Sequence, residues 1–167
     1  LKEVFASKHL SGGGPMGKRV EAFLEGELKA QRVLLTTSCT HALEIAALLL
    51  NLGPGDEVIV PSFTFVSTPN SFVLRGAKPV FADVSPETLC LDPASFARLI
   101  TKKTKAIFPV HYAGIACDMD PILALAREQG IAVVEDNAHG LFGKYKCKFP
   151  GTLGQLVTQS FHETKNF

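Results

Sequence analysis

The chain has 167 residues, of which 46% are hydrophobic and 20% charged, so it can build a sizeable core and lacks the composition of a disordered segment. Its 17 basic and 16 acidic residues give a formal net charge of +1, which excludes a broad basic surface for nucleic acid. The longest apolar stretch, residues 42–52, is interrupted by Glu44 and is too short to cross a bilayer, so we expect no membrane partner.

Short β-rich runs alternate along the chain with helical patterns, as in βαβ units. The run at 131–135 is almost free of polar residues, which is typical of a strand covered on both faces. We therefore predict an α/β fold with a mostly parallel sheet and helices on both faces. Strands are expected at 33–36, 57–61, 79–84, 105–110, 131–135 and 156–161, helices at 38–51, 67–75, 93–100 and 119–129, and a small hairpin at 142–148.

A glycine-rich run at residues 12–18 matches the spacing of a phosphate loop and also that of a dinucleotide loop. A phosphate loop needs Ser or Thr after its lysine, and this chain has Arg19 there. Both motifs also need a preceding buried strand, whereas residues 1–10 carry Lys2, Glu3, Lys8 and His9. We interpret the run as a flexible N-terminal loop that can still line a substrate cleft, and a nicotinamide-binding module is a distant alternative.

The four cysteines, at positions 39, 90, 117 and 147, are widely spaced. They form no CxxC pair for a metal and no dense disulfide pattern. Reduced thiols in a cytoplasmic protein without a metal are the simplest interpretation.

Three polar segments follow predicted strands. Asp136 ends a buried strand, at the edge where open α/β sheets bind ligands. Ser160 and Lys165 follow the last predicted strand. Residues 37–40 precede a buried helix, whose N-terminus favours phosphate. Together these segments supply an anion cradle, a buried acid and an amine.

This combination matches the needs of pyridoxal phosphate. A lysine forms the internal aldimine, an acid keeps the pyridine nitrogen protonated, and a helix terminus holds the phosphate. An aromatic residue to cover the ring is available within residues 61–65. Asp136 or Lys165 alone is more often a structural or surface residue, so the prediction depends on their combination.

On these residues, the chain resembles the DegT/DnrJ/EryC1/StrS family of pyridoxal-phosphate sugar aminotransferases. The resemblance runs through residues 34–50, 61–84, 109–120, 133–140 and 160–166, and the last block is highly specific. It implies the large domain of a fold-type I pyridoxal-phosphate-dependent transferase.

The resemblance also implies roles at matching positions. Lys165 corresponds to the Schiff-base lysine, which moves a proton between the substrate and the cofactor. Asp136 matches the pyridinium partner, His139 lies near the cofactor O3′, and Phe65 stacks on the ring. The expected phosphate ligands are Ser38, Cys39, Thr40 and Ser160, with Cys39 and Thr40 acting mainly through backbone N–H groups.

Other polar residues near these motifs have less certain roles. His111 and Tyr112 either line the sugar site or pack in the core. His162 is expected behind the site or facing solvent. Glu135 should point to the opposite side of its strand from Asp136. Cys147 stands in the predicted hairpin where the family usually has Gly, so we expect an altered or strained turn there.

The implied reaction is transamination from L-glutamate, which becomes 2-oxoglutarate, to the C4 ketone of dTDP-4-oxo-6-deoxyglucose in cell-surface polysaccharide precursor synthesis. Another nucleotide sugar or amination at C3 remains open. A sugar dehydratase of the family has His at the position of Lys165, which argues against that activity. A non-catalytic, cofactor-binding relative is the alternative from another class.

The chain begins at Leu1 and ends at Phe167, two residues after Lys165. Because family members are about twice this length or more, we expect residues 1–167 to be a partial cofactor-binding large domain. The rest of that domain and a small C-terminal domain are expected outside it, and the full-length enzyme is expected to be a homodimer or higher homo-oligomer. The 167-residue piece alone is predicted to be inactive.

Overall fold

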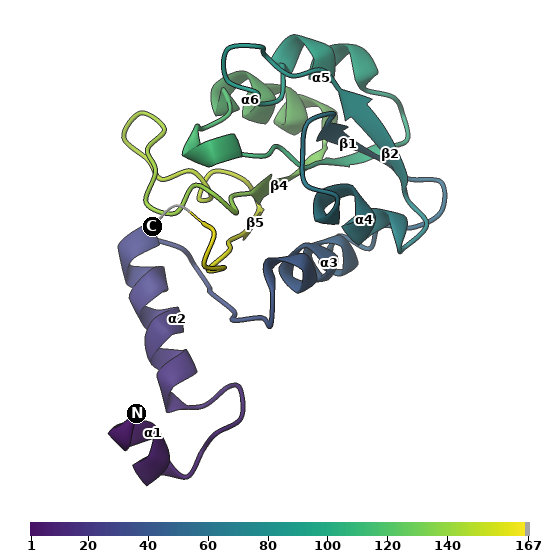
Figure 1. Ribbon diagram of the computed structural model, residues 1–167. Coiled ribbons are helices and arrows are strands. Elements are labelled where there is room, and N and C mark those ends of the chain that lie inside the picture. The colour runs from purple at the N-terminus through teal and green to yellow at the C-terminus, as the bar shows by residue number, and fades with distance from the viewer. Residues whose placement is uncertain (166–167) are drawn as a thin grey trace. The chain divides into compact units, whose positions relative to one another are not determined.

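The computed structural model describes residues 1–165, which fall into two compact units divided between Thr37 and Ser38 (Figure 1). The first unit contains helices α1 (Lys2–Ser7) and α2 (Pro15–Leu28). Gly14 caps α2 and Pro15 occupies its first turn, where the fixed φ of proline favours a helix start. The expected flexible loop is therefore wrong from Pro15 onward, because the second half of the glycine-rich run begins a helix.

The strand expected at 33–36 is also wrong. The segment is extended, but it pairs with no strand in the described part of the chain. The N–H of Val33 donates to Glu25 Oε1 at 3.0 Å, and the N–H of Leu35 donates to Glu21 Oε1 at 3.2 Å. Two glutamate side chains of α2 therefore accept hydrogen bonds from every second N–H group of this segment, the groups that a neighbouring strand would otherwise bind.

The second unit is built around a five-stranded parallel sheet with the order β2-β1-β3-β4-β5. This architecture confirms the predicted α/β fold class. The strands are β1 (Glu57–Pro61), β2 (Lys78–Ala82), β3 (Thr104–Ile107), β4 (Ala132–Asp136) and β5 (Leu156–Thr158).

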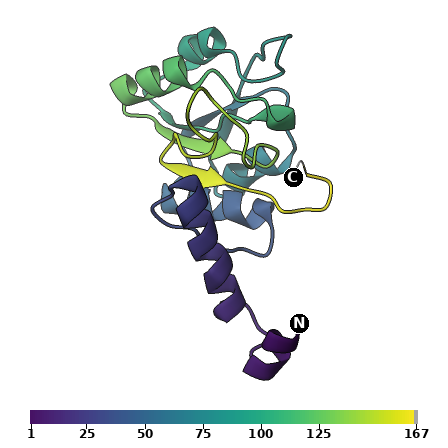
Figure 2. The same cartoon turned by 90° about the vertical axis from the view of Figure 1, so that its left-hand side faces the viewer.

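Helices cover both faces of this sheet (Figure 2). Helices α3 (Cys39–Leu49) and α4 (Ser67–Val73) pack on one face, against side chains that include Val58, Val60, Phe108 and Val134. Helices α5 (Pro93–Leu99) and α6 (Met119–Gln129) pack on the other face, against Ile59, Ile107 and Val133. Successive residues of each strand thus enter opposite cores, as the two-residue period of a strand requires.

Local signals explain the helix boundaries. The Asp92 carboxylate accepts the N–H groups of Ala94 and Ser95, and Pro93 occupies the first position of α5. Helix α6 ends at Gly130, which has a positive φ of 66°. Within the described residues, no helix is both long and apolar enough to cross a membrane.

The predicted hairpin is reduced to one antiparallel bridge between Tyr145 and Lys148. Between these two bridge residues, Lys146 has a positive φ of 53°, and Cys147 does not adopt a positive φ. The left-handed position of the turn is thus at Lys146 rather than at Cys147, so the turn is altered and Cys147 itself carries no left-handed strain. The described structure also has a short 3-10 turn, η1 (Tyr112–Gly114), after β3.

Candidate active site

Asp136 is the last residue of β4, and its side chain is buried on the face covered by α3 and α4. Its Oδ2 accepts the Thr68 hydroxyl at 2.7 Å, and its Oδ1 accepts the N–H of Ala138 at 3.2 Å. Burial raises the pKa of Asp136 above its usual value, although these two hydrogen bonds act in the opposite direction. The buried carboxylate therefore favours a cationic partner to remain ionised.

A set of hydroxyl groups connects this carboxylate to the start of α4. Thr64 Oγ1 lies 2.9 Å from Thr68 Oγ1, which in turn contacts Asp136. Thr40 Oγ1 lies 2.9 Å from Ser67 Oγ and so links α3 to α4. The sequence interpretation missed Thr64 and Thr68; the signal available was their four-residue spacing at the start of a predicted helix.

The N-terminus of α3 lies next to Asp136. The Ser38 hydroxyl accepts the N–H of His41 at 3.1 Å and so caps the helix. Burial and the negative charge of Asp136 raise the pKa of the Cys39 thiol to about 11, while Thr158 and Lys165 oppose this rise. The Cys39 side chain is thus neutral at pH 7 and lies within electrostatic range of both Asp136 and Lys165.

His139 connects the lysine to the sheet. Its Nε2 lies 3.1 Å from Lys165 Nζ, and its Nδ1 accepts the N–H of Ala113 at 3.1 Å. Burial and the charge of Lys165 lower the pKa of His139, against the opposing effect of Asp136. The ring is therefore neutral at pH 7. Because Nδ1 accepts from Ala113, the ring proton is on Nε2, which can donate to Lys165 Nζ only when that amine is neutral.

Aromatic rings surround this histidine. Tyr112 meets the ring of His139 edge-on at 5.5 Å, and Phe63 packs on Tyr112 at 4.6 Å. Tyr112 is thus placed beside the site. Phe65, the predicted stacking residue, is 72% exposed, so its stacking role stays a prediction.

The remaining predicted residues lie in different surroundings. Ser160 follows β5 and is buried, and its hydroxyl accepts the N–H of His162 at 3.3 Å. His162 is exposed, and its Nδ1 lies 2.9 Å from the Thr164 hydroxyl. His111 is fully buried and contacts Glu135, so the structure favours its core role over a place in a sugar site. Glu135 points to the opposite face of β4 from Asp136, as predicted.

These groups fit pyridoxal phosphate better than a metal ion. Among the described residues, Asp136 accepts two hydrogen bonds, which leaves acceptor capacity for a ring N–H, and Lys165 supplies an amine beside His139. The N–H groups at the start of α3 suit a phosphate. Within residues 1–165, no cluster of three or more His, Cys, Asp or Glu residues is arranged to hold a metal.

Comparisons with known proteins identify the family of this chain. Residues 1–167 match the model of the DegT/DnrJ/EryC1/StrS aminotransferase family. The spore coat polysaccharide biosynthesis protein SpsC of Bacillus subtilis is 42% identical over 153 residues, which are 92% of this chain and 39% of that protein.

Two solved structures are similar over nearly the whole chain. Spr1654 from Streptococcus pneumoniae, in its PLP form, has a TM-score of 0.90 and 33% identity, and the alignment covers 99% of this chain and 47% of that one. DesI, in the presence of its TDP-sugar product, has a TM-score of 0.91 and 35% identity, with 98% and 41% coverage.

The chain thus spans about two-fifths of the length of the curated relative that it matches. Its α/β architecture is that of the fold-type I pyridoxal-phosphate-dependent aminotransferases. A family model that matches the chain from end to end, together with these relatives, shows that the chain belongs to the DegT/DnrJ/EryC1/StrS aminotransferase family.

Proposed function

We propose that the protein containing this chain is a pyridoxal-phosphate-dependent aminotransferase of nucleotide sugars. One observation carries this proposal: the buried carboxylate of Asp136 and the amine of Lys165 both lie within electrostatic range of Cys39, the first residue of α3. Residues 1–167 would then be part of the cofactor-binding large domain, with the remainder of the enzyme contributed by further chain.

The residues of this chain would divide the work of binding and proton transfer. Pyridoxal phosphate, when bound, supplies an electron sink for bonds at the substrate α-carbon. Asp136 would hold a proton on the pyridine nitrogen, because its buried carboxylate favours a cation. Lys165 would move a proton at Nζ, and His139 would orient that amine through Nε2.

The phosphate would be bound at the start of α3. Ser38 already caps the helix, so its hydroxyl holds the first turn in place while the N–H groups of Cys39 and Thr40 bind the anion. The protonated thiol of Cys39 adds no negative charge there, because its pKa is raised to about 11. Ser160 would add a hydroxyl from the segment after β5.

The sugar nucleotide is the substrate class that the relatives support, since DesI was solved with its TDP-sugar product. Our narrower proposal is amination at C4 of dTDP-4-oxo-6-deoxyglucose with L-glutamate as donor, the activity of the dTDP-4-amino-4,6-dideoxygalactose transaminase of enterobacterial common antigen synthesis. We further propose that the full-length enzyme acts in the cytoplasm as a homodimer or higher homo-oligomer. Product NMR with 4-oxo and 3-oxo sugar nucleotides distinguishes the position of amination.

Replacement of the lysine tests the proposal. In the intact protein, borohydride reduction followed by peptide mass spectrometry should find a phosphopyridoxyl group on Lys165. Lys165→Ala should lose this adduct and both half-reactions, whereas Lys102→Ala, at an exposed lysine, should retain them. Turnover by the Lys165→Ala protein would overturn the assignment, and a wild-type adduct without turnover would favour a non-catalytic cofactor-binding relative.

A further inference from the structure

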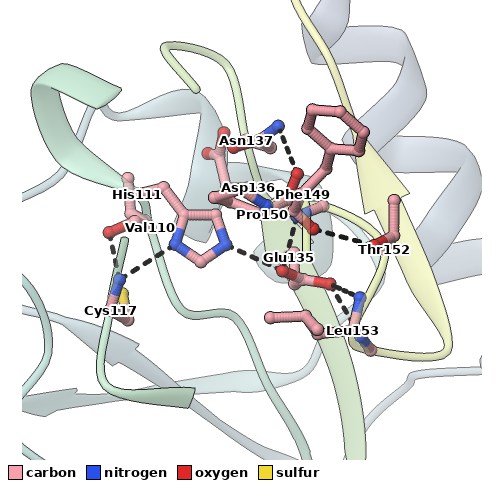
Figure 3. Close-up of polar contacts among 12 residues, drawn as sticks. Val110, His111, Cys117, Glu135, Asp136, Asn137, Phe149, Pro150, Thr152 and Leu153 are labelled. Atoms are coloured by element: carbon pink, nitrogen blue, oxygen red, sulfur yellow. Dashed lines mark hydrogen bonds and ion pairs between the residues drawn. The ribbon is translucent and has the colours of Figure 1, made fainter. Parts of the chain in front are cut away.

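Glu135, the neighbour of Asp136, is fully buried on the opposite face of β4 and is surrounded by hydrogen-bond donors (Figure 3). Its Oε2 accepts from His111 Nε2 at 2.8 Å and from the N–H of Gly151 at 2.7 Å. Its Oε1 accepts the N–H groups of Leu153 and Gly154 at 2.7 and 2.6 Å. All four acceptor positions of the carboxylate are therefore filled.

The donors come from two segments that approach β4 from either side. His111 follows β3, and its Nδ1 accepts the N–H of Cys117 at 3.1 Å, so the ring proton is on the nitrogen that faces Glu135. The three amides belong to residues 149–154, in the connection between β4 and β5. Glu135 thus joins both flanking segments to the end of one strand.

The connection at 149–154 has little space to move. Asn137 Nδ2 donates to the carbonyl of Pro150 at 3.0 Å. Gly151 has a φ of 82°, and a Cβ added there would lie 2.8 Å from Val157 Cγ2. A Cβ on Gly154 would lie 2.7 Å from the carbonyl oxygen of Val133. At Gly154 the backbone lies so close to β4 that a side chain does not fit, and at Gly151 the positive φ and the Val157 side chain of β5 disfavour one.

The same connection leads directly into the residues of the candidate site. Strand β5 begins two residues after Gly154, and Thr158 pairs with Asp136 in the ladder. The N–H of Asn137 donates to the carbonyl of Thr158 at 2.9 Å. The chain then continues to Ser160 and Lys165. The placement of Lys165 relative to Asp136 therefore depends on where residues 149–154 hold the start of β5.

Glu135 is suited to anchoring rather than to proton transfer. Burial acts to raise its pKa, but the hydrogen bonds from His111, Gly154 and Gly151 outweigh that effect and lower it. The group remains ionised at neutral pH, with no free lone pair for a substrate.

We propose that Glu135 is a positioning residue, whose carboxylate fixes the segment from residue 149 to Lys165 against the strand that carries Asp136. The effect of Glu135 on catalysis rests on the function proposed above. Its effect on the position of residues 149–165 does not depend on that function. The structure thus assigns the two neighbouring carboxylates different tasks, one at the cofactor and one behind it.

Hydrogen–deuterium exchange of the cofactor-free intact protein tests the anchoring. In Glu135→Gln, an NH₂ group replaces one acceptor oxygen and opposes two N–H donors. We expect exchange about tenfold faster or more at residues 151–154 and also at 158–165. Glu128→Gln, the same change at an exposed site on α6, should exchange like the wild type. Faster exchange confined to 151–154 would overturn the proposal.

Kinetics of the holoenzyme provide the second measurement. Glu135→Gln should lower kcat about 10- to 100-fold while the KM for the sugar nucleotide stays within about threefold, because the lysine is displaced and the substrate contacts are not. An unchanged kcat would overturn the proposal. If the wild type traps no cofactor on Lys165, the proposed function fails, yet the exchange experiment still decides the anchoring.

A milder variant covers the case in which Glu135→Gln does not fold. His111→Leu removes one donor and leaves the three amides on the carboxylate. It should increase exchange in the same two segments by a smaller factor. No change at 158–165 in this variant would also contradict the proposal.

Discussion

Glu135 and Asp136 are consecutive buried residues that lie on opposite faces of β4. Their carboxyl pKa values are shifted in opposite directions. Glu135 accepts four hydrogen bonds, and its pKa is lowered. From the residues that the structure describes, Asp136 accepts two, those of Thr68 and Ala138, and its pKa is raised. Both residues carry a carboxylate at the end of β4. The carboxylate of Glu135 has a hydrogen-bond donor for each acceptor position, whereas that of Asp136 has too few donors among the described residues.

The number of hydrogen-bond donors around a buried carboxylate distinguishes a group that stabilises the fold from a group that can bind a ligand. A carboxylate whose lone pairs are all filled gains from being ionised in the folded chain, and it holds its donors in place. A carboxylate with unfilled capacity costs free energy when ionised, and that cost is recovered when a cation binds. Spare acceptor capacity, rather than burial alone, is therefore the feature on which we propose Asp136 as the ligand-binding group.

The largest expected effect comes from removing the charge of Asp136. Asp136→Asn in the intact enzyme should lower kcat by about 10²–10³-fold, because a neutral amide no longer stabilises a protonated ring nitrogen. Steady-state kinetics with saturating cofactor measure this change, and Glu128→Gln serves as the matched loss of an exposed carboxylate. A kcat within a factor of about three of wild type would remove Asp136 from the site.

A second effect concerns acid stability on the other face. The lowered pKa of Glu135 means that its contribution is fully present above the ordinary value of 4.5 and is lost as the pH falls through the lowered pKa. Urea unfolding at pH 7 should show Glu135→Gln to be less stable than wild type by about 1–3 kcal/mol. This difference should shrink below pH 4.5. A pH-independent difference would mean that the charge of Glu135 is not responsible.

The smallest expected effect comes from the hydroxyl that supports Asp136. Thr68→Val keeps the shape of the side chain but removes the 2.7 Å hydrogen bond, which helps to lower the pKa of Asp136. We expect kcat to fall about five- to tenfold, equivalent to about 1 kcal/mol. Thr68→Ser should restore most of the rate. If the Ser and Val variants behave alike, the methyl packing of Thr68 matters and its hydroxyl does not.

Features governed by local chemistry could be predicted from the sequence. The Asp92-Pro93 start of α5 and the Gly130 end of α6 depend on neighbouring residues alone. The two-residue period of a strand was enough to place Glu135 and Asp136 on opposite faces. The segments expected to carry Asp136, Cys39 and Lys165 also come together in the structure.

Features that depend on distant partners could not be predicted. The extended segment at 33–36 resembles a strand, but its amides bind Glu21 and Glu25, and nothing in the segment itself shows this. The start of α2 was not predicted, because the glycines around Pro15 are typical of a loop. The amides on Glu135 come from a connection about 16 to 19 residues away, so its anchoring role is visible only in three dimensions.

The contrast between the two carboxylates is tested most directly by unfolding free energies of the cofactor-free intact protein at pH 7. The raised pKa of Asp136 means that its cost is present above that pKa and disappears as the pH falls through it. Asp136→Asn should therefore be more stable than wild type by about 0.5–2 kcal/mol, while Glu135→Gln should be less stable. Changes of the same sign in both variants would contradict the division of roles.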